Sequence, residues 1–231
     1  METQADSFSG FYPAFRIPHS EFDVMAAKII KIDPSHPDQA FSRCSDVISS
    51  GGVIAYPTDT FYGLGADPAN PAAVKRLFEI KGRGTDQPIL LLLSDAGEVK
   101  NWAAEITPQA SVLMKRFWPG PLTLVFKAKA GMLPELTAGT GTIGLRVPGS
   151  ELTRGLLRFL GHALTGTSAN LSGRPSPGTA RETAEAIGDL AELILDGGET
   201  AGGKPSTVVD ASVDPPRVIR EGAIPSQDIT G

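Results

Sequence analysis

The chain has 231 residues, 41% hydrophobic and 20% charged, and is long enough to bury the core of one large domain or two small ones. Its net charge of −5 argues against nonspecific nucleic-acid binding, and its lone cysteine, Cys44, excludes internal disulfides and C-x-x-C zinc or redox sites. No apolar run approaches the ~20 residues that span a bilayer, and Met1 to Ser9 lack an early arginine, so we expect a cytoplasmic protein without a membrane span or leader peptide.

The order of the expected elements divides the chain into an arm and a domain. Residues 1–27 show no clear period and several turn formers, which indicates a loosely attached N-terminal arm. No internal repeat or long linker divides residues 28–231, so we expect one domain there. Runs rich in leucine and β-branched residues predict strands at 52–58, 89–93, 122–128, 142–147, 163–167, 192–195, 207–210 and 217–219. Helical periodicity predicts helices at 38–49, 71–80, 107–117, 150–160 and 179–188.

Three of these helices carry recognisable start signals. Asn70 and Thr107 are N-cap residues placed directly before a proline, and Thr179 forms a capping box with Glu182. Strands that alternate with helices define an α/β protein. Because the later strands follow one another after short turns, we expect antiparallel pairs in a twisted mixed sheet with flanking helices, and not a purely parallel doubly wound sheet.

Two neighbouring segments suit an anionic ligand. Residues 56–65 read YPTDTFYGLG, so an expected strand runs into a turn rich in hydroxyls and glycines, and Lys81-Gly82-Arg83 ends the following helix. Hydroxyls, close backbone N–H groups and cations together suit phosphate or carboxylate. Each segment also has a purely structural interpretation. The hydroxyl turn can satisfy its own backbone, and the basic triplet can complement the helix dipole and end at glycine.

A third segment, residues 166–176, follows an expected strand directly and reads GTSANLSGRPS. Ligands usually enter α/β sheets at the carboxyl ends of strands, where small hydroxyl and amide side chains can hold a sugar and phosphates. For this segment we therefore favour a ligand site over a plain turn. Arg146 and Arg220 lie at the ends of two other strands, and together with Lys81 and Arg83 they could converge on a polyanion.

Two familiar phosphate-binding patterns fail on their context. Residues 139–144 fit G-x-G-x-x-G but lead into an extended segment, where a dinucleotide site needs a helix. Residues 198–204 fit the spacing of a phosphate loop, but Pro205 replaces the Ser or Thr that holds magnesium, and a strand follows. The sequence has no G-x-S-x-G elbow and no histidine in the context of a nucleophile's base, so covalent hydrolase chemistry is not expected.

Six motifs, in this order, resemble the YrdC/Sua5 family. They are YPTDTFYGLGAD at 56–67, KGR at 81–83, FWPGPLT at 117–123, LRVP at 145–148, SANLSG at 168–173 and STVVD at 206–210. The resemblance runs from Ile29 to Ile224 and implies a twisted α/β sheet with a large, positively charged concave cleft. Since the sequence stops soon after Arg220, it resembles the short, single-domain form of the family.

The resemblance also implies an activity, that of an L-threonylcarbamoyladenylate synthase, a nucleotidyltransferase. Such enzymes combine L-threonine, bicarbonate or CO2 and ATP into threonylcarbamoyl-AMP and pyrophosphate. A partner transferase then passes the threonylcarbamoyl group to adenosine 37 of tRNA, giving the t6A modification. Mg²⁺ is expected to accompany ATP, because the sequence shows no carboxylate cage for a metal, and direct contact with tRNA stays open.

Site residues follow from the same resemblance, position by position. The matches to ATP-binding positions are Lys81, Arg83, Thr142, Ser168, Asn170, Ser176 and Arg220. The matches to threonine-binding positions are Thr58, Arg146, Gly166 and Ser206. Lys81 and Arg83 are also the catalytic candidates, since cations can neutralise charge on phosphates. Arg146 is expected to pair with the carboxylate of the amino acid.

Two alternatives stay open on the sequence. The first is a non-catalytic RNA- or nucleotide-binding module that uses the same basic cleft, and ATP affinity that ignores threonine and bicarbonate would favour it. The second is an O-carbamoyltransferase-type use of the domain inside hydrogenase-maturation proteins. Those proteins carry an acylphosphatase-like module and zinc-finger cysteines, which a chain with only Cys44 lacks.

Overall fold

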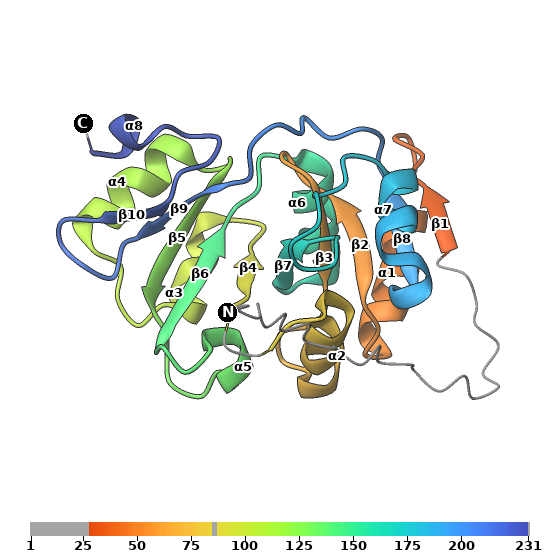
Figure 1. Ribbon diagram of the computed structural model, residues 1–231, viewed down its shortest axis with the longest axis horizontal. Coiled ribbons are helices and arrows are strands. Elements are labelled where there is room, and N and C mark those ends of the chain that lie inside the picture. Colours follow the sequence, from red (N-terminus) through yellow and green to blue (C-terminus); the bar gives the residue numbers. More distant parts are fainter. Residues whose placement is uncertain (1–27, 85–86, 231) are drawn as a thin grey trace, which may run out of the picture.

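The fold is built on one twisted mixed sheet with helices on both sides (Figure 1). The computed structural model describes residues 28–84 and 87–230, so the expected N-terminal arm at 1–27 lies outside the described residues. Within these ranges the sheet has ten strands in the order β1-β8-β2-β3-β7-β4-β6-β5-β9-β10. The expected fold class, an α/β protein with a mixed sheet and flanking helices, is confirmed.

The strands are β1 (Lys28–Lys31), β2 (Ile54–Pro57), β3 (Tyr62–Gly65), β4 (Leu90–Leu92), β5 (Leu122–Lys127), β6 (Thr142–Arg146), β7 (Leu164–Ser168), β8 (Leu193–Asp196), β9 (Thr207–Asp210) and β10 (Arg217–Arg220). The α-helices are α1 (Pro37–Ser49), α2 (Pro71–Lys81), α3 (Val99–Trp102), α4 (Pro108–Phe117), α5 (Pro134–Thr137), α6 (Glu151–Leu160), α7 (Ala180–Ile187) and α8 (Ser226–Thr230). Two 3₁₀ turns, η1 (Ala96–Glu98) and η2 (Gly188–Leu190), complete the described elements.

All eight expected strands and all five expected helices are present, with ends shifted by one or two residues. The sequence missed β1 and β3, and it missed the short helices α3, α5 and α8. β3 was taken for a turn because Gly63 and Gly65 lower its strand propensity. Both glycines lie against the ring of Tyr56, and a Cβ on Gly65 would come within 2.6 Å of Tyr56 Cε1. Close packing therefore explains why this segment forms a strand despite its low strand propensity.

The pairing of the strands confirms the expectation of a mixed sheet. β1–β8, β2–β8, β4–β6 and β5–β9 are parallel pairs, whereas β2–β3, β3–β7, β4–β7, β5–β6 and β9–β10 are antiparallel. β8 lies between β1 and β2, but β9 lies near the other end of the sheet. The connection between them, residues 197–206, runs along the top of the molecule in Figure 1.

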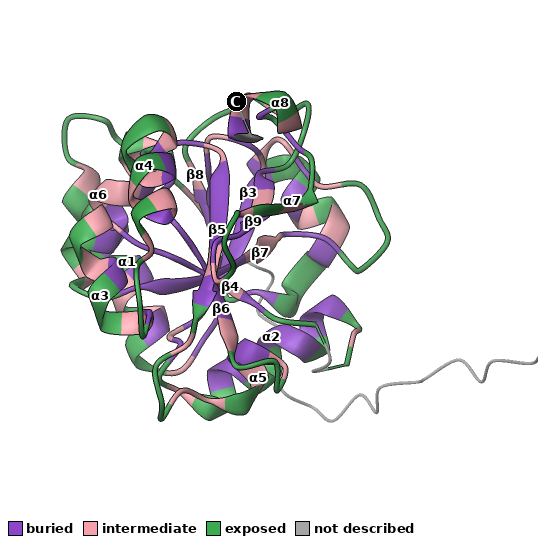
Figure 2. Cartoon of the chain, turned by 90° about the vertical axis from the view of Figure 1, so that its left-hand side faces the viewer, coloured by how far each residue is buried: buried purple, intermediate pink, exposed green. Residues whose placement is uncertain are grey.

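Two apolar clusters hold helices against the sheet. One cluster joins α1 and α6 to β2 and β8 through side chains that include Phe41, Cys44 and Leu156. The larger cluster includes side chains of α2, α4 and α7 together with the strands at the centre of the sheet. Figure 2 shows buried strands in the middle with α1 and α6 on one side and α2 and α7 on the other. The site therefore rests on strands whose opposite residues are fixed in a packed core.

The helix start signals are confirmed in their geometry. Asn70 accepts hydrogen bonds from the N–H groups of Ala72 and Ala73, and Thr107 accepts one from Ala110. Thr179 accepts from the N–H of Glu182, but the Glu182 carboxylate accepts from the N–H of Gly178, one residue before the position of a capping box. α2 ends at Gly82 in the left-handed conformation, with φ +59°. Lys81 and Arg83 are placed by this ending.

The two rejected phosphate motifs are indeed turns. Gly139 and Gly141 have positive φ values and lead into β6. Gly198, Gly202 and Gly203 also have positive φ values and lie in the connection to β9. Neither segment opens a helix, so neither offers the helix N-terminus that those motifs require.

Candidate ligand cavity over the sheet

A cavity of about 570 Å³ lies over the centre of the sheet. Its floor follows the alternation of side chains along β5, β6 and β9. On β6, Thr142, Gly144 and Arg146 line the cavity, while Ile143 and Leu145 point into the core. On β5 the cavity side carries a threonine and a valine and the core side carries large apolar residues. On β9, Val208 lines the cavity, while Thr207 and Val209 are buried on the other side. The strand pattern therefore builds the site and the core together.

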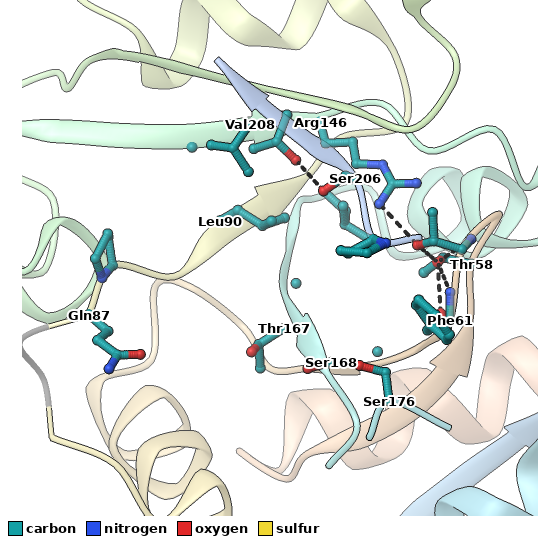
Figure 3. A pocket seen from close by; sticks show the side chains of 18 of the residues that line it. Thr58, Phe61, Gln87, Leu90, Arg146, Thr167, Ser168, Ser176, Ser206 and Val208 are labelled. Carbon is teal, nitrogen blue, oxygen red and sulfur yellow. Dashed lines mark hydrogen bonds between the residues drawn. The ribbon is translucent and has the colours of Figure 1, made fainter. Parts of the chain in front are cut away.

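Register places the floor residues in two rows. The first row carries the polar side chains: Arg146 on β6, which pairs with Leu92 of β4, and Thr123 on β5, whose Oγ1 lies 3.0 Å from Ser206 Oγ. The second row is apolar, with the pairs Leu90–Gly166 and Val125–Gly144. In Figure 3, Gln87 lies at one end of the cavity, Leu90 near its middle, and Arg146, Ser206 and Thr58 at the other end. The cavity thus has a polar end and a flatter apolar stretch.

Glycines are required in the second row because leucine side chains lean over them. A Cβ on Gly166 would lie 2.6 Å from Leu90 Cδ1 and 3.0 Å from Leu92 Cγ. A Cβ on Gly144 would lie 3.2 Å from Leu90 Cβ. Any other residue at Gly166 would push the leucines or fill the floor, so the glycine keeps the cavity open.

Lys81 is buried beside the cavity and tied to the loop after β7. Its Nζ donates to the backbone carbonyls of Ser168 and Asn170, both at 2.5 Å, and to Asn170 Oδ1 at 2.9 Å. In return, the N–H of Ser172 donates to the Lys81 carbonyl. Burial, and next the charge of Arg83, lower the Lys81 pKa from 10.5 to about 8. The ammonium therefore holds this loop in shape as well as contributing charge.

The hydroxyl turn between β2 and β3 is closed by Thr58. Thr58 Oγ1 donates to the Phe61 carbonyl at 2.7 Å and accepts from the N–H groups of Thr60 and Phe61. The structural interpretation of this turn is thus realised, and the turn also lines the cavity. Two bonds fix the turn to the 197–206 connection: Gly202 N–H donates to the Thr60 carbonyl, and Tyr62 Oη donates to the Gly198 carbonyl.

Arg146 lies at the polar end in a frame of three partners. Its Nε donates to the Gly120 carbonyl at 3.0 Å, and its Nη2 donates to Asp59 Oδ1 at 2.6 Å. Nη1 lies 3.4 Å from Thr60 Oγ1. Asp59 was not among the expected site residues. Its signal in the sequence is its position between two cavity-lining threonines, but sequence alone could not show that it faces Arg146.

The remaining cations complete a basic lining. Arg83 Nη1 donates to Gln87 Oε1 at 3.2 Å, and Arg220 Nη2 donates to the Ser206 carbonyl at 2.9 Å. Burial, and next the charge of Arg146, lower the Arg220 pKa. Among the described residues that line the cavity, four are Lys or Arg and none is Asp or Glu. The four cations that were expected to converge on a polyanion do line one cavity, within an acidic chain.

Every residue expected at the site lines this one cavity. The set is Thr58, Lys81, Arg83, Thr142, Arg146, Gly166, Ser168, Asn170, Ser176, Ser206 and Arg220. Lining alone does not assign their roles. The sequence analysis missed Gln87, Leu90, Thr123 and Gly144. Strand alternation could have found the last two, since each lies two residues from another cavity-lining position of its strand, Val125 and Thr142.

The described part of the chain shows neither a cluster of metal ligands nor a membrane-spanning helix. Over residues 28–84 and 87–230 no group of three or more His, Cys, Asp or Glu side chains is placed to hold a metal ion. No helix within those ranges has the length and apolar character needed to cross a membrane.

The chain is similar in sequence to known proteins over most of its length. The family model Sua5_yciO_yrdC, described as "Telomere recombination", matches residues 46–222. A threonylcarbamoyl-AMP synthase of Pyrococcus abyssi is 42% identical over 183 residues, covering 79% of this chain and 54% of that protein. The chain thus spans about half the length of this relative.

Two solved structures share the fold. The crystal structure of P. abyssi Sua5 complexed with L-threonine has a TM-score of 0.83 and 38% identity, covering 87% of this chain and 59% of that one. The crystal structure of E. coli YciO has a TM-score of 0.78 and 29% identity, covering 88% and 99%. The family model spans the strands that carry the cavity, and the chain belongs to the Sua5/YciO/YrdC family.

Proposed function

We propose that this protein is a threonylcarbamoyl-AMP synthase. It would convert L-threonine, CO2 or bicarbonate, and ATP into threonylcarbamoyl-AMP and pyrophosphate. The observation that carries the proposal is the cavity itself, where the eleven expected residues from separate segments meet. Four of the eleven are cations, and no carboxylate lines the cavity among the described residues. The relatives named threonylcarbamoyl-AMP synthase and the neighbour that holds L-threonine support the same reaction.

The chemistry needs positioned charges more than a protein nucleophile. The threonine amine adds to CO2 and loses a proton, which gives a carbamate. A carbamate oxygen then attacks the α-phosphate of ATP, forming the new O–P bond as the bond to pyrophosphate breaks. Negative charge grows on the phosphates in this step, and cations fixed in the cavity stabilise it. Lys81, Arg83 and Arg220 are the cations proposed for the phosphates, with Lys81 acting through the Ser168–Asn170 loop that it holds.

The two ends of the cavity suit the two substrates. A volume of about 570 Å³ lies within the range of small-molecule sites. We place the amino acid at the polar end, near Thr58, Arg146 and Ser206, with Gly166 on the floor beside it. We place ATP along Lys81, Arg83, Thr142, Ser168, Asn170 and Ser176, with Arg220, which donates to the Ser206 carbonyl, where the two substrates meet. Mg²⁺ would enter with ATP as part of that substrate, held by phosphates and water, because no carboxylate lines the cavity among the described residues.

The product defines the next step. Threonylcarbamoyl-AMP is a reactive mixed anhydride, so a separate transferase would use it to modify adenosine 37 of tRNA. Direct contact between this chain and tRNA stays a prediction, as does a cytoplasmic location.

The test is a reconstitution with the purified chain. The protein is incubated with MgATP, L-threonine and bicarbonate, pyrophosphate is followed over time, and threonylcarbamoyl-AMP is sought by mass spectrometry. We expect pyrophosphate release that requires threonine and bicarbonate together with an adduct of the right mass. ATP binding that ignores both co-substrates, with no adduct, would instead support the non-catalytic binding module.

A further inference from the structure

Arg146 has an acidic neighbour, Asp59, that does not line the cavity. The side chains of Arg146 and Asp59 are 6% and 17% exposed, and Arg146 Nη2 donates to Asp59 Oδ1 at 2.6 Å. Arg146 lines the cavity, whereas Asp59 does not. The carboxylate therefore acts on the site only through the guanidinium, from the side away from the ligand.

The second oxygen of Asp59 supports this one-sided role. Asp59 Oδ2 is buried and accepts no hydrogen bond from any residue in the described ranges. It points toward Gly149, whose Cβ, if it had one, would lie 3.0 Å away. A buried carboxylate oxygen without a donor is costly in free energy, and a neutral side chain would avoid that cost. The salt bridge from Arg146 to the other oxygen, Oδ1, offsets part of this cost.

The Asp59 carboxylate and the Gly120 carbonyl fix the plane of the guanidinium. Of the five N–H groups of an arginine, Nε–H goes to Gly120, one Nη2–H to Asp59 and one Nη1–H toward Thr60. The remaining N–H groups are left for a ligand in the cavity. Since the arginine is held before the ligand arrives, little side-chain freedom is lost on binding.

Asp59 sets the charge balance at the polar end of the cavity. Burial, and next the charge of Arg146, lower the Arg220 pKa, so the two guanidinium groups act on each other as like charges. Asp59 lies at salt-bridge distance from Arg146 and offsets part of this positive charge. A net-neutral Arg146–Asp59 unit binds a carboxylate but tolerates a neighbouring ammonium. A bare cluster of cations would favour phosphate instead.

We propose that Asp59 is a positioning residue that orients Arg146 and, by its charge, reserves the polar end of the cavity for a zwitterionic amino acid over a phosphate group. The inference rests on the proposed function, since it assumes that the amino acid occupies this end. Asp59 thus contributes specificity without contact with the substrate.

Calorimetric titration of the full chain with L-threonine, and separately with inorganic phosphate, tests this idea. Asp59→Asn keeps an oxygen acceptor for Arg146 but removes the charge, and Asp59→Ala removes both. We expect phosphate to compete with threonine in both variants and not in the wild type. The dissociation constant for threonine should rise about tenfold or more in Asp59→Ala and less in Asp59→Asn. Asp46→Asn, an exposed change on α1, should behave as wild type.

A double-mutant cycle guards against a general folding effect. In an Arg146→Ala background, Asp59→Asn should no longer change threonine or phosphate binding, and it should raise the melting temperature by removing an unpaired buried charge. Equal effects of Asp59→Asn in both backgrounds would overturn the proposal, as would an Asp59→Asn protein with no gain in phosphate affinity. Synthesis of the adduct is measured in parallel. A wild type that binds threonine without making adduct would refute the proposed function alone.

Discussion

The Nζ of Lys81 lies 2.9 Å from Oδ1 of Asn170, so the last residue of α2 is joined to the loop that follows β7. The two residues are far apart in the sequence but lie at one edge of the same cavity. Asn170 in turn donates from Nδ2 to the carbonyl of Arg174, which extends the link along the loop. A single buried ammonium thus contributes charge to the cavity and holds the shape of its wall.

Lys81→Ala should abolish pyrophosphate release while the protein stays folded. The variant loses the charge and frees the carbonyls of Ser168 and Asn170, so we expect turnover to fall at least ~100-fold, in the range of losing one preorganised electrostatic contact. Lys81 belongs to neither apolar cluster that packs the helices against the sheet, so its loss should not unfold the chain. Pyrophosphate assays and circular dichroism measure the two effects.

Lys75→Ala is the matched control for this experiment. Lys75 lies on the same helix, is exposed and faces Glu79 at 4.0 Å. It should keep wild-type turnover. A Lys81→Ala protein with normal activity would contradict the catalytic role assigned to Lys81.

From the titration of Lys81 we expect opposite pH trends for the affinity for ATP and for the free energy of unfolding. Its folded pKa of about 8 lies below the ordinary 10.5, so below pH 8 the folded and unfolded states both carry the charge. Between about pH 8 and 10.5 the folded state releases the proton while the unfolded state keeps it. The contribution of Lys81 to stability therefore rises with pH in this window. The affinity for ATP should fall over the same window, because the cavity loses a positive charge.

Dissociation constants for ATP and melting temperatures between pH 7 and 9.5 measure these trends. Lys81→Met, which cannot titrate, should remove the part of each slope that is due to this residue. If the wild type and Lys81→Met gave the same pH profile for ATP, the assigned titration would be wrong.

The sequence predicted the elements with strong local signals and missed those decided by packing. Asn70 and Thr107 predicted the starts of their helices, because an N-cap residue directly before a proline is typical of a helix N-terminus. β3 was missed because its two glycines argue against a strand. The glycines are explained by close contacts with the Tyr56 ring and with Leu164 and the Thr167 carbonyl of β7. Local sequence does not show which residues of other strands a glycine will contact.

The sequence predicted site residues that lie in the family motifs. It did not predict which of these segments contact one another in the fold. Lys81 and Arg146 were found from their motifs, and both line the cavity. The sequence analysis expected the Arg146 guanidinium to pair with the carboxylate of the amino acid. In the structure, one of its nitrogens, Nη2, already donates to Asp59. That partner belongs to a hairpin 87 residues away, so only the fold reveals it.

Arg146→Ala should act mainly on threonine. Its guanidinium lies at the polar end, where the carboxylate of the amino acid is expected, so we expect the KM for threonine to rise ~10-fold or more while the KM for ATP changes much less. Initial rates with each substrate varied in turn provide the comparison. Arg181→Ala, an exposed change on α7, serves as the control. An unchanged KM for threonine would refute the proposed carboxylate pairing.

Thr123→Val tests a hydroxyl that no sequence motif had assigned to the site. Thr123 and Ser206 are 2% and 4% exposed, and their hydroxyl oxygens lie 3.0 Å apart on the floor of the cavity. Valine keeps the shape of threonine but leaves Ser206 without this partner. A lost neutral hydrogen bond corresponds to about 1 kcal/mol, so we expect the KM for threonine to rise ~5-fold with little change in kcat.

The Ser206→Ala variant separates orientation from direct contact. If Thr123 acts by orienting the Ser206 hydroxyl, Thr123→Val should add nothing once Ser206 is alanine, because the hydroxyl that it orients is gone. Steady-state kinetics of the two single variants and the double variant decide the point. Additive losses would mean that Thr123 binds the substrate by itself, and its role would then be that of a second contact on the floor of the cavity.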